Sequence, residues 1–113
     1  MKSVWITGGS RGIGAAAVRE FARAGWRTAF SWHSSEAAAQ ALVRKLAAEG
    51  CAVLAVRGDM RRRSEVHECA RQIRAAFGRI DALVCNAGAA QQKLFQDITD
   101  EDWDFLFDSN LKS

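Results

Sequence analysis

The sequence predicts an α/β fold in which a doubly wound parallel sheet carries helices on both faces. Two observations support this prediction. Strand-like and helix-like periods alternate along the 113 residues, and a glycine-rich turn joins the first strand to the first helix. Connections between parallel strands of one sheet are almost always right-handed. We therefore expect a single domain whose connecting helices cover the sheet.

The first half of the chain is expected to hold two strands and two helices. Apolar, β-branched and aromatic residues predict strands at Lys2–Thr7 and Arg27–Trp32. The first helix should end at Gly25, since glycine favours the left-handed conformation that closes a helix. Its expected inward face is formed by Ile13, Ala17, Val18 and Phe21. The second helix begins near Ser35 and ends at Gly50, with an apolar stripe at Ala38, Ala39, Leu42, Val43 and Leu46.

The second half repeats the pattern. We expect strands at Ala52–Arg57 and Asp81–Asn86, with a helix between them that Ser64 caps and Gly78 ends. The inward residues of this helix are Val66, Ala70, Ile73 and Phe77. The residues after Asn86 are interpreted as a loop. A fourth helix then begins at residues 99–102, and its inward residues are Trp103, Phe107 and Leu111.

The segment Thr7-Gly8-Gly9-Ser10-Arg11-Gly12-Ile13-Gly14 predicts a binding site for a phosphorylated ligand. Gly8 permits a sharp turn, Gly12 allows the backbone to approach a pyrophosphate, and Gly14 allows helix and strand to pack closely. The first amides of the helix have no partner within the helix and point toward the anion. Because the turn lies between a predicted strand and a predicted helix, the sequence favours a dinucleotide site.

Composition excludes several other classes of function. The net charge of +3 is small and scattered, which does not indicate a nucleic-acid partner. The basic run Arg61–Arg63 is interpreted as the solvated start of a helix, with an anion-binding patch as the alternative. Cys51, Cys69 and Cys85 have no CxxC spacing and no histidine cluster near them, so buried free thiols in a reducing compartment are expected, and no metal site is expected. Without a leader or a membrane-length apolar run, we expect a cytoplasmic protein with no membrane partner.

Four motifs in register resemble the short-chain dehydrogenase/reductase family. Thr7–Gly14 is similar to its TGxxxGxG cofactor turn, and Asp59 to the acid that contacts adenine. Asn86-Ala87-Gly88 matches the end of its NNAG segment, with Cys85 in place of the first asparagine. Asn110 matches the helix asparagine that holds a relay water. The segments 77–81 and 99–103 resemble most closely the corresponding segments of 3-oxoacyl-acyl carrier protein reductases.

The resemblance implies a Rossmann-type domain that binds a nicotinamide cofactor. Residues 1–113 would form an incomplete domain that stops after the fourth strand and the start of the next helix. The implied catalytic residue is Asn110. The expected cofactor-binding residues are Thr7, Gly8, Ser10, Arg11, Gly12, Ile13, Gly14, His33, Ser34, Asp59, Met60, Asn86, Ala87 and Gly88.

NADP(H) is expected in preference to NAD(H). NAD sites place an acid at the end of the second strand to bind the ribose hydroxyls. Here Phe30–Ser35 contains no acid, and the first one is Glu36. Arg11, in the glycine turn, can bind a 2′-phosphate through its guanidinium, and His33, Ser34 and Ser35 can add hydrogen bonds.

The reaction of this family needs a tyrosine and a lysine four residues later, and the sequence contains no tyrosine. His33, expected near the adenosine, and His67, expected on an outer helix face, are poorly placed to replace it. We therefore expect the cofactor-binding part of an NADPH-dependent ketone or 3-oxoacyl reductase, inactive as this chain alone. The alternatives are a stand-alone NADP(H)-binding half domain and one piece of a split enzyme.

Two further expectations follow from the resemblance. The full-length protein should act on a small or carrier-bound carbonyl compound, and it should form a homo-oligomer. A sheet that stops at the fourth strand would leave Leu83–Cys85 as an unpaired edge.

Overall fold

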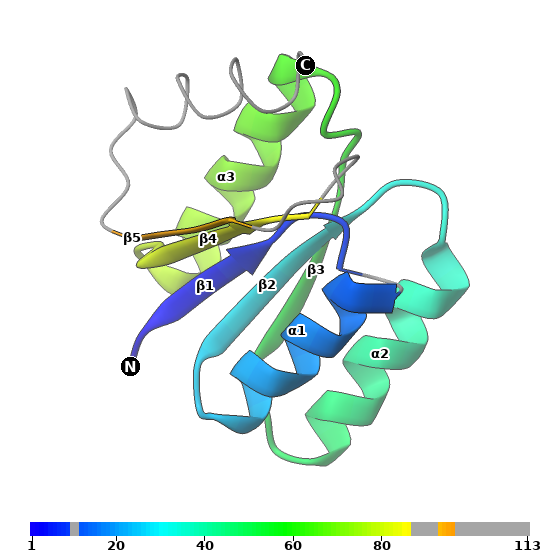
Figure 1. Cartoon of the computed structure of the whole chain (residues 1–113), viewed down its shortest axis with the longest axis vertical. Coiled ribbons are helices and arrows are strands. Elements are labelled where there is room, and N and C mark those ends of the chain that lie inside the picture. Colours follow the sequence, from blue (N-terminus) through cyan, green and yellow to red (C-terminus); the bar gives the residue numbers. More distant parts are fainter. Residues whose placement is uncertain (10–11, 87–92, 97–113) are drawn as a thin grey trace.

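The computed structural model describes residues 1–9, 12–86 and 93–96 (Figure 1). Their strands are β1 (Ser3–Ile6), β2 (Arg27–Trp32), β3 (Val53–Arg57), β4 (Ala82–Cys85) and β5 (Lys93–Gln96). Their helices are α1 (Gly12–Arg23), α2 (Glu36–Ala48) and α3 (Arg63–Phe77). The strand order across the sheet is β3-β2-β1-β4-β5, and β1 to β4 run parallel. This confirms the predicted doubly wound α/β fold.

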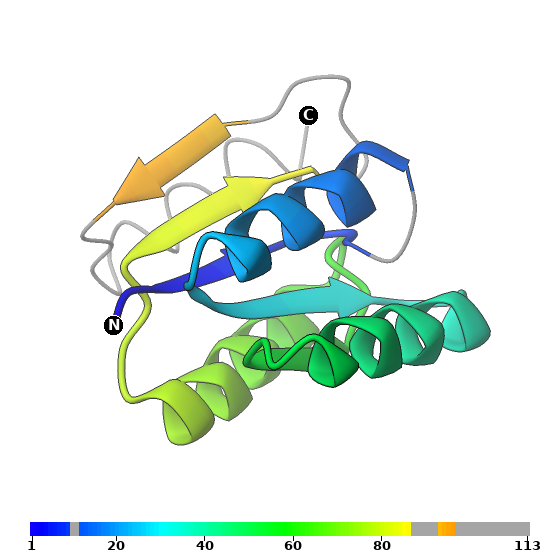
Figure 2. The same ribbon diagram turned by 90° about the horizontal axis from the view of Figure 1, so that it is seen from below.

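Helices cover both faces of the sheet (Figure 2). Alternate side chains of β1 contact different helices. Val4 and Ile6 pack on one face with residues of α1 and α2, such as Val18 and Leu46. Trp5 points to the other face, where it joins α3 residues such as Ile73. All four residues of β1 are buried, because this strand lies between β2 and β4. The carboxyl ends of the four parallel strands consequently meet at one edge of the sheet.

The strand β5 was not predicted. We expected residues 93–96 to lie in a loop and β4 to be an edge strand with unpaired backbone groups. Instead β5 pairs antiparallel with β4, from Ala82 opposite Gln96 to Cys85 opposite Lys93. This prediction was wrong because a four-residue segment is too short for its hydrophobic pattern to predict a strand. The strand forms because its pairing satisfies the backbone N–H and C=O groups of β4.

Two predictions about helices were also wrong. Ile13 was placed on the inward face of α1, yet its side chain is 66% exposed. The buried residues of α1 are Gly14, Ala15, Val18 and Ala22, because Gly14 lies against the turn and rotates the helix to that face. The N-cap of α3 is Arg62, not Ser64. Glu65, inside the first turn of α3, accepts a hydrogen bond from the backbone N–H of Asp59 at 2.9 Å and ties this helix start to the preceding loop.

The other helix predictions are close to the structure. α2 begins after Ser35, as expected, and buries Ala39, Leu42 and Leu46. Gly25, Gly50 and Gly78 follow the three helices with positive φ angles. The predicted fourth helix, with Trp103, Phe107 and Leu111, lies outside the described residues. Among the helices that are described, none is long and apolar enough to cross a membrane.

Candidate functional site

The carboxyl ends of β1 and β4 are joined by the side chains of Thr7 and Asn86. The Thr7 Oγ1 accepts a hydrogen bond from the backbone N–H of Asn86 at 2.8 Å. The Thr7 backbone N–H donates to the Val84 carbonyl at 3.0 Å, and Asn86 Nδ2 donates to the Gly8 carbonyl at 3.3 Å. These bonds fix the start of the glycine turn on the two central strands.

Three glycines of the turn have the geometry expected from the sequence. Gly8 and Gly12 have φ angles of +67° and +59°, a left-handed backbone that glycine adopts without strain. A Cβ on Gly14 would lie 2.2 Å from the Gly8 carbonyl oxygen and 2.7 Å from Asn86 Nδ2. Helix α1 therefore approaches the turn as closely as only glycine allows. A Cβ on Gly12 would meet no atom of the described residues within 4 Å, so among these residues it leaves open space in front of the turn.

The sequence reasoning did not assign a role to Gly9 or Gly58. A Cβ on Gly9 would lie 2.5 Å from Phe30 Cβ, and the Gly9 N–H donates to the Ser31 carbonyl at 3.1 Å, which ties the turn to β2. A Cβ on Gly58 would lie 2.5 Å from Cys69 Sγ. Gly58 follows β3 directly, and Gly9 lies in the turn soon after β1; these positions next to strand ends were the available signal.

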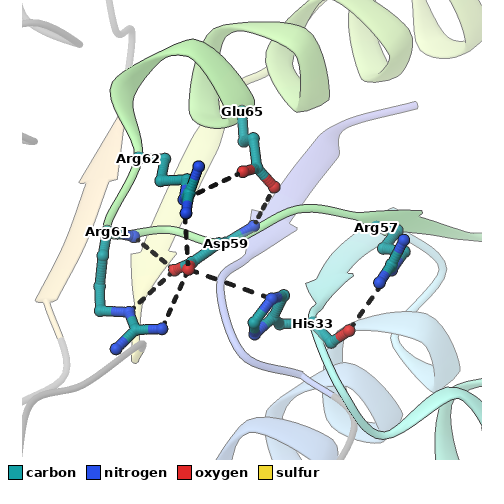
Figure 3. Close-up of polar contacts among 6 residues, drawn as sticks. All are labelled: His33, Arg57, Asp59, Arg61, Arg62 and Glu65. Atoms are coloured by element: carbon teal, nitrogen blue, oxygen red, sulfur yellow. Dashed lines mark hydrogen bonds and ion pairs between the residues drawn. The ribbon is translucent and has the colours of Figure 1, made fainter.

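The ends of β2 and β3 carry a second group of polar side chains, centred on Asp59 (Figure 3). Asp59 Oδ1 accepts hydrogen bonds from the backbone N–H and the Nε of Arg61, and Oδ2 accepts one from Arg61 Nη2, each at 3.0 Å. His33 Nε2 and Arg62 Nε each lie 4.0 Å from Oδ2. Among the contacts of the described residues, Oδ2 keeps acceptor capacity for a donor on a ligand.

Hydrogen bonds keep Asp59 ionised. The side chain of Arg61, and after it the backbone N–H of the same residue, lower the pKa of Asp59 to about 2. On the neighbouring helix α3, the Cys69 thiol donates a hydrogen bond of 3.5 Å to the carbonyl of Arg57, the last residue of β3. Burial, followed by the charges of Glu65 and Glu68, raises the pKa of the Cys69 thiol to about 11. Cys69 is thus a neutral packing residue, while Asp59 presents a negative charge at the end of β3.

The Asp59 contacts predict acid-sensitive stability. The lowered pKa gives the folded chain an advantage above the ordinary value of about 4, lost as pH falls toward about 2. We expect wild type to melt above Asp59→Asn at pH 7, with a constant difference down to pH of about 4 that then shrinks. Melting temperatures of both proteins across this range test it. Arg61→Gln should remove the same acid-dependent part, and a difference between wild type and Asp59→Asn that is independent of pH would contradict the assignment.

The structure thus brings most of the predicted residues to one edge of the sheet. Thr7, Gly8, Gly12, Ile13, Gly14 and Asn86 surround the turn, and His33, Ser34, Asp59 and Met60 lie at the ends of β2 and β3. The Met60 side chain is buried in the core, which leaves its backbone for any ligand contact. Ser10, Arg11, Ala87, Gly88 and Asn110 lie outside the described residues.

Other polar residues at this edge were missed or interpreted differently. Arg57 and Glu65 were not predicted as part of a site, and for Arg61 and Arg62 an anion-binding patch was only the alternative to a solvated helix start. Arg61 and Arg62 are exposed, as a solvated helix start requires, yet both contact Asp59. The separation of two residues between Asp59 and Arg61 was an available signal. His67 is exposed and Cys85 is buried in the sheet, as expected. No group of metal-ligating side chains occurs among the described residues.

Comparisons with known proteins agree with the fold. The model of the short chain dehydrogenase family matches residues 2–113. The 3-oxoacyl-[acyl-carrier-protein] reductase FabG of Staphylococcus epidermidis is 33% identical over 111 residues, which are 98% of this chain and 46% of the relative. The chain thus spans less than half the length of this curated relative.

Solved structures give the same result. A short-chain dehydrogenase/reductase variant from Serratia marcescens has a TM-score of 0.78 at 32% identity, covering 98% of this chain and 45% of its own. A blue fluorescent protein from a metagenomic library, crystallised with NADPH, has a TM-score of 0.74 at 36% identity. It covers 90% of this chain and 42% of its own.

Proposed function

This chain belongs to the short-chain dehydrogenase family, and from that premise we propose that residues 1–113 form an NADP(H)-binding Rossmann domain of a carbonyl reductase. The bound nicotinamide would supply hydride to a ketone.

The geometry of the glycine turn is the main support. Left-handed Gly8 and Gly12, the close contact at Gly14 and the open space in front of Gly12 make a cradle at the start of α1. The first N–H groups of a helix have no partner within it, and the helix dipole favours an anion there. These residues fit a pyrophosphate. Asp59 and the Met60 backbone, at the end of β3, would then receive the adenine.

The choice of NADP(H) over NAD(H) is supported by the end of β2. The six residues of β2 and the three that follow it contain no acid, and His33 and Ser34 are exposed there. A carboxylate at this place would bind the ribose hydroxyls of NAD and repel a 2′-phosphate. The similar metagenomic protein was solved with NADPH.

The substrate proposal rests on the relatives. The Staphylococcus protein is named for reduction of a 3-oxoacyl group on acyl-carrier protein, so a small or carrier-bound carbonyl compound is the proposed substrate class. A full-length homo-oligomer and a water-holding role for Asn110 belong to the same proposal. Since the chain has no tyrosine, we propose that it binds cofactor without reducing the substrate by itself.

A stand-alone binding half domain, or one piece of a split enzyme, is the second candidate. It is favoured by one observation. β5 pairs with β4 and covers the edge that would otherwise expose unpaired backbone groups. Within the described residues this pairing moves the edge of the sheet from β4 to β5, and the satisfied backbone groups of β4 favour folding of the chain alone.

Isothermal titration tests the cofactor proposal. We expect one NADPH per chain and weaker binding of NADH, with no oxidation of bound NADPH when a 3-oxoacyl thioester is added. Failure of the folded chain to bind either dinucleotide would refute the proposed function. Turnover by the chain alone would refute only its expected inactivity.

A further inference from the structure

Arg57 lies across the carboxyl ends of β2 and β3. It is the last residue of β3 and pairs in register with Trp32, the last residue of β2. Its guanidinium lies 5.7 Å from the centroid of the Trp32 ring. Figure 3 shows its other contact, a long hydrogen bond of 3.5 Å that the Arg57 Nε donates to the His33 carbonyl. The aromatic face and the carbonyl together hold an exposed cation beside His33.

The charge of Arg57 is not compensated. Two acids are present in this group, and each already has an arginine partner. Asp59 binds Arg61, and Glu65 lies 3.6 Å from Arg62. No carboxylate of the described residues forms an ion pair with Arg57. The six side chains of Figure 3 therefore include one guanidinium whose charge is available to an anion from outside the chain.

We propose that Arg57 selects NADP(H) by binding the 2′-phosphate of the cofactor, together with His33 and Ser34. This inference rests on the proposed function. In a doubly wound sheet the adenosine ribose lies against the end of the second strand, which here is Trp32. A planar guanidinium binds phosphate through two parallel hydrogen bonds, and stacking on Trp32 leaves its outer N–H groups for that purpose.

This position differs from the one that the sequence suggested. There the expected cation was Arg11 of the glycine turn, outside the described residues. Arg57 was not considered, because it is distant in sequence from both the turn and the end of β2. The parallel pairing of β3 with β2 brings Arg57 beside Trp32, at the end of β2.

The test compares cofactor affinities of three variants by isothermal titration. Arg57→Gln should weaken NADPH binding about tenfold and change NADH binding less than about twofold. Arg57→Lys keeps the charge without the planar pair of donors, so an intermediate loss of NADPH affinity is expected. The control is Arg23→Gln at the end of α1, which removes the same charge from an exposed arginine at the opposite edge of the sheet and should change neither affinity.

A second readout needs no substitution. In the wild-type chain 2′,5′-ADP should bind more tightly than 5′-AMP, and only the former should shift the Arg57 Nε–H signal in NMR spectra. Inorganic phosphate at equal concentration should leave that signal in place, which separates a nucleotide subsite from a simple anion site.

The outcomes separate this inference from the proposed function. Equal losses for NADPH and NADH, or no loss in Arg57→Gln, would overturn the role of Arg57 while leaving dinucleotide binding intact. A wild-type chain that binds neither dinucleotide would refute the proposed function itself. If Arg57→Gln does not fold, Arg57→Lys and the wild-type NMR signal decide.

Discussion

Replacement of Gly14 by alanine is expected to unfold the glycine turn and to destabilise the domain by about 3 kcal/mol, the upper part of the range for overpacking. The added Cβ would lie 2.2 Å from the Gly8 carbonyl oxygen and 2.7 Å from Asn86 Nδ2. A backbone carbonyl has no rotamer to change, so α1 must move away from β1. The free energy of unfolding in urea, followed by tryptophan fluorescence, measures the effect.

Gly50→Ala is the matched control for this variant. Gly50 has a φ of +85° and no atom within 4 Å of the added Cβ, so only backbone strain of roughly 1–2 kcal/mol is expected. Equal destabilisation by the two substitutions would contradict the steric role of Gly14. NADPH binding should be lost in Gly14→Ala and kept in Gly50→Ala.

The second large effect concerns binding more than folding. Gly12→Ala places a Cβ in open space in front of the turn, where the pyrophosphate is proposed to lie. We expect the variant to fold, with strain of roughly 1–2 kcal/mol from its φ of +59°, and to bind NADPH at least about tenfold more weakly. Melting curves and titration of the same sample separate the two contributions.

Gly25→Ala serves as the control, because Gly25 follows the opposite end of α1. It also has a positive φ, of +93°, and no atom within 4 Å of an added Cβ. The two variants should lose similar stability, and only Gly12→Ala should lose affinity. A normal affinity in Gly12→Ala would place the cofactor elsewhere.

Local periodicity predicted most of the fold. Both bounds of β2 were predicted correctly, because the run of aromatic and small residues between Gly25 and the polar Ser34 is typical of a strand. The glycines that end the helices were visible for the same local reason. Within the turn, the sequence implied the steric roles of Gly8, Gly12 and Gly14, but it did not reveal the contact of Gly9 with Phe30.

The errors arose where distant segments meet. β5 forms through its pairing with β4, and this pairing cannot be predicted from the four residues of β5 alone. The rotation of α1 that exposes Ile13 follows from the contact between Gly14 and Gly8. The Asp59 group likewise joins the end of β2 to the loop before α3, so the sequence favoured a solvated helix start at Arg61–Arg63 and did not predict its contacts with Asp59.

The location of the cofactor is tested most directly by amide chemical shifts of the 113-residue chain during titration with NADPH. The account predicts shifts at Gly8, Gly12 and Asn86 around the turn, and at His33 and Asp59 at the ends of β2 and β3. Amides at the opposite edge of the sheet, such as those of Gly25 and Gly50, should remain in place. Shifts confined to that opposite edge, or no shifts at saturating NADPH, would contradict the account.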